Sequence, residues 1–357
     1  MKKIKWLSAI LALTVLSGCA SSAPSESAER IVWNYGNADE RGELYTDSGE
    51  RLNFVDFDTM QSALLCSKPN CTHANAKECS AFGMSNHPIL YGDKLYFFDV
   101  ETNFDGDEVT DTTTVYKADP DGTNRVKACE IEGLSLLTYT RMLIVGDRAY
   151  FSMDKTGWNE EQTASSGYNE VWFCGFDFST DTFEKIEMLH EGWCSSSWIF
   201  GLYDNKVVFR YAYSEEKVPY LENANDIGKY LTNVYKAYDT ENGVMSELTL
   251  PEPLCVGGGY YVYEKDGGAV ALSESGKEMP LPDFSAGANL TITNGKLFNC
   301  SEQVCADLSN GKMYKLNSPD NLVVYSDGNY ILKSFNGLKQ AYEYSKTPEK
   351  DYIGGAL

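Results

Sequence analysis

The sequence predicts an all-β protein built as a single β-propeller. The chain is rich in residues that favour strands, with 24 Tyr and 16 Phe among its 357 residues. A unit of turn, strand, strand, polar turn and strand recurs along it. We count about seven such units at spacings of roughly 30–60 residues, a pattern typical of propeller blades. Six or eight blades fit the same pattern, and an irregular β-sandwich or two smaller β-domains is the alternative architecture.

The turns of these units recur in two sets. Their residues are mostly Gly, Asp, Asn and Ser, which tolerate left-handed backbone or bond their own main chain. The first turns begin at Gly92, Gly146, Asp204, Gly258, Asn294 and Asp327. The second turns begin at Asp119, Asp177, Asp239, Glu274, Asp307 and Asn336, and Asp56–Thr59 matches them in an earlier unit. Longer spacings predict insertions over Val100–Thr113 and Ser214–Leu231, the second with a helical turn.

The first residues predict export and a lipid anchor. Three lysines precede an apolar run, Trp6–Leu16, which is too short to span a bilayer and is typical of a signal peptide. The sequence Leu16-Ser17-Gly18-Cys19 resembles the bacterial lipobox, and this resemblance implies cleavage before Cys19 and lipid on its thiol. The alternative is an ordinary signal peptide with a chance cysteine. The resemblance implies a place on the outer face of the cell membrane, or the outer membrane in a Gram-negative cell.

Three segments follow from this interpretation: a signal peptide at 1–18, a lipid-anchored flexible tether at 19–32, and the propeller at 33–357. The stretch Ala20–Arg30 is rich in Ser, Ala and Pro and cannot bury apolar area. Loss of the leader with its three lysines takes the net charge from −22 to −25. Such an acidic chain is not expected to bind nucleic acid, whose partners carry a basic footprint. Lipid rather than charge would therefore hold it at a membrane.

One repeat unit carries a family resemblance. The stretch Val115–Arg125 places an Asp-Pro-Asp-Gly turn after a short aromatic strand and resembles TolB-like and YWTD-like propeller repeats. Together with the lipobox, it resembles bacterial surface lipoproteins of unknown function. The resemblance supports the propeller fold and implies no particular activity.

The most distinctive local motif is Cys66-x4-Cys71-x-His73-x5-Cys79 within the loop 66–79. Three thiols and an imidazole are the ligand types of a structural Cys3His zinc site, and a metal would order a loop that has few apolar residues. The alternative is a disulfide from Cys66 or Cys71 to Cys79, as is common in exported proteins, or free thiols. Nine cysteines remain besides Cys19, so they cannot all pair within one chain. A cross-strand disulfide between Cys300 and Cys305 is a further hypothesis.

An acidic stretch, Glu101–Asp107, has oxygen ligands at alternate positions, but Thr112 occupies the place where an EF-hand needs glutamate. Calcium is therefore not expected there, and a solvated acidic loop is the default.

Enzyme motifs are absent from the sequence. The chain has three histidines and neither a nucleophile elbow nor a phosphate-binding loop. We therefore expect a binding or scaffold module for a protein, peptide or glycan rather than an enzyme. The alternative is a carbohydrate-active hydrolase or lyase that uses paired carboxylates at the propeller mouth. The segment Glu191–Trp198, with two tryptophans, is a candidate contact surface or a pair of core residues, and the loop Lys155–Tyr168 with Trp158 is expected to be exposed.

Overall fold

The computed structural model shows an all-β chain of 28 described strands with one 3-10 helix, η1 (Ala224–Lys229), and one short helix, α2 (Glu349–Tyr352). No helix in the described part of the chain is long and apolar enough to cross a membrane. The structure describes residues 29–32, 36–39, 41–47, 50–75, 78–84, 86–105, 108–136, 140–157, 168–219, 221, 224–281, 284, 290–338 and 341–357.

The described strands form antiparallel sheets that follow one another along the chain, and we number the resulting units 1 to 7. Unit 1 consists of β2 (Gly36–Ala38), β3 (Gly42–Thr46), β4 (Leu52–Asp56) and β5 (Gln61–Leu64). Unit 2 consists of β6 (Ile89–Tyr91), β7 (Lys94–Asp105), β8 (Glu108–Ala118) and β9 (Val126–Glu132).

Units 3 and 4 share one eight-stranded sheet, which begins with β1 (Arg30–Val32) on the inner side of β10. The 22-residue strand β13 joins them, because it pairs with β12 up to Trp193 and with β14 from Trp193 onward. Unit 3 contains β10 (Met142–Val145), β11 (Arg148–Gly157), β12 (Tyr168–Asp177) and the first part of β13 (Thr182–Tyr203). Unit 4 contains the rest of β13 with β14 (Lys206–Ser214), β15 (Thr232–Asp239) and β16 (Val244–Glu247).

The last three units have shorter strands. Unit 5 consists of β17 (Pro253–Gly257), β18 (Tyr260–Lys265), β19 (Gly268–Ser273) and β20 (Glu278–Leu281). Unit 6 consists of β21 (Leu290–Thr293), β22 (Lys296–Asn299), β23 (Val304–Asp307) and β24 (Met313–Leu316), with β28 (Ile353–Ala356) at its edge. Unit 7 consists of β25 (Asn321–Ser326), β26 (Asn329–Asn336) and β27 (Ala341–Pro348).

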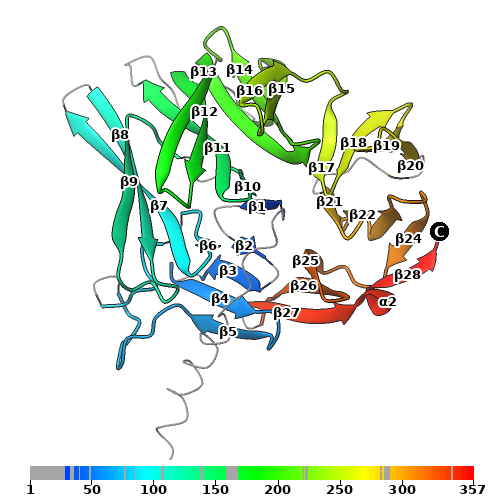
Figure 1. Cartoon of the computed structure of the whole chain (residues 1–357), viewed down its shortest axis with the longest axis horizontal. Coiled ribbons are helices and arrows are strands. Elements are labelled where there is room, and N and C mark those ends of the chain that lie inside the picture. Colours follow the sequence, from blue (N-terminus) through cyan, green and yellow to red (C-terminus); the bar gives the residue numbers. More distant parts are fainter. Residues whose placement is uncertain are drawn as a thin grey trace, which may run out of the picture.

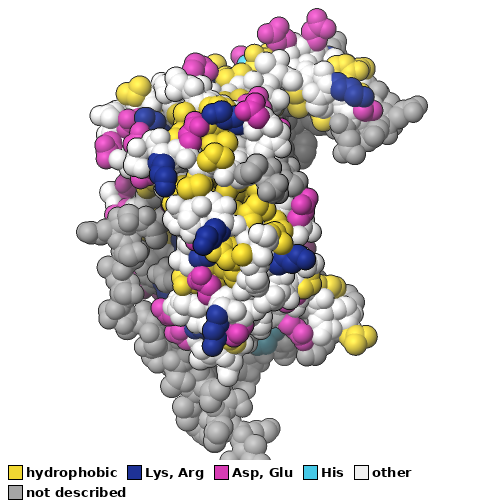
Figure 2. All heavy atoms as spheres, turned by 90° about the vertical axis from the view of Figure 1, so that its right-hand side faces the viewer, with side chains coloured by type: hydrophobic (Ala, Val, Ile, Leu, Met, Phe, Trp, Pro, Cys, Tyr) yellow, Lys and Arg dark blue, Asp and Glu magenta, His cyan; other side chains and the backbone are white. Residues whose placement is uncertain are grey.

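The units stand in chain order around a common centre, which defines a β-propeller (Figure 1). Buried side chains of the described residues form seven hydrophobic clusters, and each cluster lies between two consecutive units. The smallest contains Val55 and Phe57 of unit 1 with Ile331 of unit 7, and it closes the ring. Aromatic and β-branched side chains fill these interfaces because one strand face of each unit needs an apolar neighbour. On the side formed by the right-hand sheets, hydrophobic side chains also reach the surface among charged ones (Figure 2).

A repeated hydrogen bond ties the two turns of a unit together. The amide that follows the first residue of the second turn donates to a carbonyl of the first turn, as from Phe178 to Asp147 at 2.9 Å. The same bond joins Phe57 to Arg41, Thr240 to Asn205, Leu308 to Gly295, and Glu349 to Gly328. In unit 5 the first residue of the second turn, Glu274, itself donates to Gly259 O. These turns therefore lie on one side of the ring, the short-turn face. The second and third strands of each unit meet on the other side, the long-hairpin face.

Two sequence predictions about turns change. Asn336–Gly337 was expected to be a second turn, but it connects β26 to β27, and Pro348–Glu349 takes that role. The expected insertion at Val100–Thr113 is instead a continuation of the β7–β8 ladder, with Val100 opposite Thr113. The insertion after Ser214 contains the predicted helical turn, η1.

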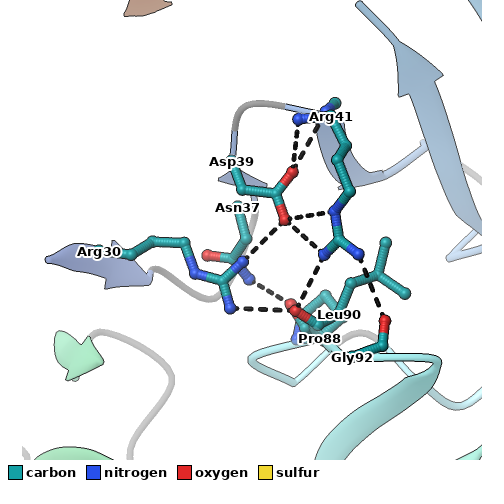
Figure 3. A network of polar contacts seen from close by, with 8 residues as sticks. Arg30, Asn37, Asp39, Arg41, Pro88, Leu90 and Gly92 are labelled. Atoms are coloured by element: carbon teal, nitrogen blue, oxygen red, sulfur yellow. Dashed lines mark hydrogen bonds and ion pairs between the residues drawn. The ribbon is translucent and has the colours of Figure 1, made fainter. Parts of the chain in front are cut away.

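The chain enters the fold earlier than expected. The predicted tether ended at residue 32, yet Arg30–Val32 pair with β10 at the ring centre. Their side chains explain this, because Val32 is fully buried and the Arg30 guanidinium binds the Asp39 carboxylate at 3.0 Å. Figure 3 shows the network in which Arg30 also donates to Leu90 O at 3.1 Å. Residues 1–28, with the predicted signal peptide and Cys19, lie outside the described residues.

Candidate metal centre

The four predicted ligands lie on the connection between unit 1 and unit 2, between β5 and β6 on the outer side of the ring (Figure 1). This segment has almost no regular structure and turns sharply, with left-handed backbone at Asn70 (φ 61°) and His73 (φ 54°). Cys79 is buried, whereas Cys66, Cys71 and His73 are half-buried. The loop therefore obtains little stability from apolar burial and needs another source of order.

The structure brings the four side chains together. One ligand atom from each of Cys66, Cys71, His73 and Cys79 lies within 4.8 Å of all the others. His73 Nδ1 lies 3.3 Å from Cys79 Sγ. A tetrahedral zinc site with Zn–S bonds of ~2.3 Å has ligand–ligand edges of ~3.8 Å, so the cluster matches such a site in size and donor type. The Cys3His group could hold a metal ion.

The two flanking thiols differ in acidity. Burial opposes charge on Cys66, but hydrogen bonds from Ser80 and from the Lys68 amide outweigh it and lower the pKa of the thiol to about 6. Burial raises the pKa of the Cys79 thiol to about 11, against a hydrogen bond from the Ala81 amide, and the neighbouring Cys66 raises it further. The protein part of the cluster thus favours one thiolate. A bound cation would supply the charge that stabilises the others.

The disulfide alternative does not describe this structure. Cys66, Cys71 and Cys79 are all free thiols. Cys300 and Cys305 are also free in this structure, and their pairing stays a prediction. Cys305 stands opposite Phe298, while Cys300 lies beyond the end of β22 with its sulfur 3.9 Å from the Tyr352 hydroxyl.

The loop is docked onto the second turn of unit 2, residues 119–124. In unit 2, Pro120 stands where the other units have the amide that donates the repeated turn bond, and proline has no amide hydrogen to donate. The cysteine loop takes over this contact, because Ser80 Oγ donates to Asp121 O at 2.9 Å and Ser67 Oγ donates to the Asp121 carboxylate. Arg125 reaches back and donates to Phe82 O at 2.7 Å. The loop thereby joins units 1 and 2.

A shallow hollow of about 300 Å³ opens beside Cys79, between the loop and this turn. It is lined by Lys68, Cys79, Ser80, Gly122, Thr123, Asn124 and Arg125.

The other predicted candidates fall into ordinary structural positions. Glu101 and Asn103 lie in β7 opposite Thr112 and Thr110, so the acidic stretch is a strand rather than a calcium loop; residues 106–107 lie outside the described part. His87 is buried with Nε2 2.6 Å from Thr140 O, and burial lowers its pKa to about 4. His190 stacks on Tyr213 at 3.5 Å.

The two tryptophans of Glu191–Trp198 are half-buried members of β13 rather than full core residues. Trp193 meets the Tyr168 ring edge-on at 5.3 Å, and Trp198 lies under the Arg141 guanidinium at 4.4 Å. Most of the predicted loop around Trp158, residues 158–167, lies outside the described residues.

Sequence reasoning missed the residues that support the loop. Asp121 belongs to a turn with several relatives in the chain, and Arg125 is an isolated basic residue. The one available signal was Pro120, which interrupts a recurring turn bond in the unit that follows the cysteine motif.

Fold and site together define the class: a single all-β propeller with a Cys3His cluster on its rim. No family model matches the chain, and no curated protein matches it. Among solved structures, the chain is similar to an oligogalacturonate lyase from Vibrio parahaemolyticus, with 11% identity and a TM-score of 0.38 over 88% of this chain and 76% of that one. The computationally designed Ika8 protein has 11% identity and a TM-score of 0.37 over 90% and 98% of the two chains.

A third similar structure is the Nup133 β-propeller domain from Vanderwaltozyma polyspora, with 9% identity and a TM-score of 0.28 over 68% of this chain and 69% of that chain. At such identities and scores, these likenesses carry no information on activity. The fold class rests on the sheet topology and on the hydrophobic clusters between consecutive units.

Proposed function

We propose that this chain is a lipid-anchored, extracytoplasmic β-propeller that binds a protein, peptide or glycan partner and performs no catalysis of its own. One observation carries the proposal: the β26–β27 hairpin presents large apolar side chains to solvent on the long-hairpin face. Phe335 is 56% exposed, Tyr342 is 50% exposed and Leu338, near the tip, is 99% exposed. Clustered exposed apolar side chains mark interaction surfaces, and propellers bind partners through such loops.

A second aromatic group supports the same face. Tyr168, the first residue of β12, stands opposite Trp193 in the middle of β13, and the Lys217 ammonium lies 5.6 Å from the Trp193 ring. Tyrosine and tryptophan supply contact area at low entropic cost, and a cation over an aromatic ring adds polarity. Such a surface suits peptide or sugar ligands.

The Cys3His cluster has a separate role in this proposal. We propose that Cys66, Cys71, His73 and Cys79 hold a structural zinc ion. Four protein ligands would close the coordination shell, which is the arrangement of structural rather than catalytic zinc. The ion would supply the order that the loop lacks.

A carbohydrate-active enzyme is the second candidate, because Glu170 and Glu191 stand directly opposite each other on β12 and β13, beside Tyr168 and Trp193. Opposed residues share one sheet face with Cβ atoms ~4.5–5.5 Å apart. However, Lys155 binds the Glu170 carboxylate at 2.7 Å and lowers its pKa. A glycosidase acid needs a raised pKa, so the pair fits a binding surface better.

The test uses purified, lipidated full-length protein on arrays of glycans and peptides. We expect binding that is lost when Phe335 and Leu338 are changed to Ser, and retained when Val126 and Val244, which are similarly exposed on the opposite face, are changed to Ser. Equal loss in both variants would contradict a hairpin surface. Release of glycan products, abolished by Glu191→Gln, would establish the enzyme instead. Transfer of the Cys19→Ala protein from the membrane fraction to the medium tests the anchor.

A further inference from the structure

The segment that follows the first 28 residues runs through the middle of the ring. Glu29 projects between units 4 and 5, where its carboxylate accepts the Leu202 amide at 2.8 Å and the Gly258 amide at 3.3 Å. Gly201 makes room for it, since a Cβ there would stand 2.7 Å from Glu29 Oε1 and 2.4 Å from Val256 O. Inner strands of two neighbouring units thus close around this side chain.

The next residues contact the inner strands of the other side. Arg30–Val32 pair with β10 of unit 3. The Arg30 guanidinium binds Asp39 of unit 1 and Leu90 O of unit 2 (Figure 3). Four consecutive residues therefore contact units 1 to 5 at the centre of the ring, where Figure 1 shows β1. They occupy the place in which propellers commonly hold ligands.

The direction of entry is also determined. Glu29 and Arg30 lie beside the first turns of three units. The two amides that Glu29 binds are at the first turns of units 4 and 5: Leu202 comes just before the first, and Gly258 is part of the second. Arg30 stands opposite Ile144, which comes just before the first turn of unit 3. Val32 stands opposite Met142, at the other end of β10. The chain thus passes from the short-turn face toward the long-hairpin face.

We infer that residues 29–32 are a built-in plug of the central channel, and that the chain's own path turns the short-turn face toward the membrane and leaves the long-hairpin face for the partner. The inference rests on the proposed lipid anchor at Cys19. It excludes the channel as the ligand site and assigns partner binding to the hairpin ends.

The length of chain before Glu29 supports this orientation. Glu29 is ten residues after Cys19, and ten residues reach ~36 Å at full extension. If the long-hairpin face were turned toward the membrane, the segment between Cys19 and Glu29 would have to take a longer path. It would run outward across the four strands of a unit and then along the length of the outermost strand to the other face. Strands spaced ~4.8 Å apart and a nine-residue strand such as β14 make that path roughly 50 Å. The tether is too short for it.

Energy transfer to the membrane tests the orientation. The lipidated full-length protein carries a fluorescent non-natural amino acid at Ser275, in the second turn of unit 5, or at Leu338, near the β26–β27 tip. Vesicles of neutral phosphatidylcholine contain an acceptor dye on a small share of headgroups. We expect roughly threefold higher transfer from position 275, since the faces lie roughly 20–40 Å apart.

Hydrogen exchange tests the plug itself. Exchange of the Leu202 and Gly258 amide hydrogens, slow in the parent, should become fast in Glu29→Ala.

Each outcome has one meaning. Equal transfer from both positions, or higher transfer from position 338, overturns the orientation. Unchanged exchange at Leu202 and Gly258 in Glu29→Ala overturns the plug. If the Cys19→Ala protein floats with vesicles as the parent does, the lipid anchor of the proposed function fails, and the orientation fails with it. Flotation that depends on Cys19 with reversed transfer overturns the orientation alone.

Discussion

The two junctions on either side of unit 1 are held in opposite ways. At the junction with unit 2, a polar loop carries the Cys3His cluster and docks through hydrogen bonds to a turn. At the junction with unit 7, the chain does not connect the two units directly. A buried ion pair and aromatic side chains close the propeller there. Lys333 of β26 binds Glu43 of β3 at 2.5 Å, with side-chain exposures of 17% and 6%.

The closing junction surrounds its cation with tyrosines. The Lys333 ammonium lies 4.4 Å from the Tyr342 ring, 5.4 Å from Tyr344 and 5.9 Å from Tyr45. Burial raises the pKa of Tyr344 far above its ordinary value, and the charge of Glu43 raises it further. A desolvated pair with cation–π contacts is strong when intact and costly when one partner is lost.

Because the two junctions are held differently, damage to each should have a different effect on the propeller. Units 1 and 2 remain neighbours through the chain even if the cysteine loop loses order. Among the described residues, units 7 and 1 meet through side-chain contacts, including those of the small cluster of Val55, Phe57 and Ile331. Failure at the closing junction should therefore open the whole ring, whereas failure at the loop should stay local.

The largest expected effect comes from Lys333→Met, which leaves the Glu43 carboxylate buried without its cation. We expect a loss of ~3–4 kcal/mol in the free energy of unfolding by urea denaturation. The double variant Glu43→Gln, Lys333→Met should recover more than half of it, because no charge is left unpaired. Lys265→Met, which breaks an exposed pair with Glu278, is the control and should cost less than ~1 kcal/mol. A loss equally small in Lys333→Met would show that apolar contacts alone close the ring.

Removal of one thiol from the loop should have the next largest effect. Cys71→Ser is expected to abolish stoichiometric zinc in elemental analysis and to lower the unfolding free energy by ~2–3 kcal/mol, since the loop has few apolar contacts to replace the ion. Chelation of the parent should reproduce the loss.

Cys300→Ser, which changes a half-buried thiol outside the cluster, should retain zinc. Proteolysis should then cut the loop 66–79 of Cys71→Ser while the sheets remain protected. Retention of zinc by Cys71→Ser would eliminate the cluster as a metal site.

The fold class and the convergence of the Cys3His group could be predicted from the sequence, whereas the contacts at the two junctions could not. Turn residues repeat for two reasons: Gly258 provides left-handed backbone (φ 55°), and the Asp177 carboxylate accepts backbone amides of its own turn. The Cys3His group is recognisable because its four donor side chains lie within 14 residues of sequence, which brings them close together in space. Lys333 and Glu43 are 290 positions apart, and neither differs from any other surface charge until the ring closes. The contacts of Glu29 could not be predicted from the sequence either, because its partners are backbone amides, which every residue type except proline has.

The contact between loop and turn should contribute less than the ion. Asp121→Ala removes the acceptor of Ser67 and of Thr123, whose hydrogen bonds outweigh burial and lower the pKa of this carboxyl. We expect a cost of ~1–2 kcal/mol and faster transfer of zinc to a competing chelator. Asp177→Ala, which removes the same kind of turn bond in unit 3, should cost a similar amount without changing zinc release. Equal zinc release in the two variants would contradict docking through Asp121.

The final prediction concerns Glu29 of the plug, whose carboxylate contacts units 4 and 5 and neither of the two junctions. Burial raises the pKa of Glu29 to about 7 from an unfolded value of 4.5, despite hydrogen bonds from Leu202 and Gly258 that lower it. The folded state therefore binds this proton more tightly than the unfolded state. Its stabilising contribution is present in full below pH 4.5 and is lost as the pH rises through about 7. Burial also raises the pKa of Asp154 to about 7, so this carboxyl adds to the same fall in stability with rising pH. In Glu29→Gln the stability lost between pH 5 and pH 7.5 should shrink by roughly 2 kcal/mol relative to the parent, and Asp154→Asn measures the other share separately. A parent and a Glu29→Gln variant with the same slope would show that Glu29 stays ionised in the channel, held by its two amides alone.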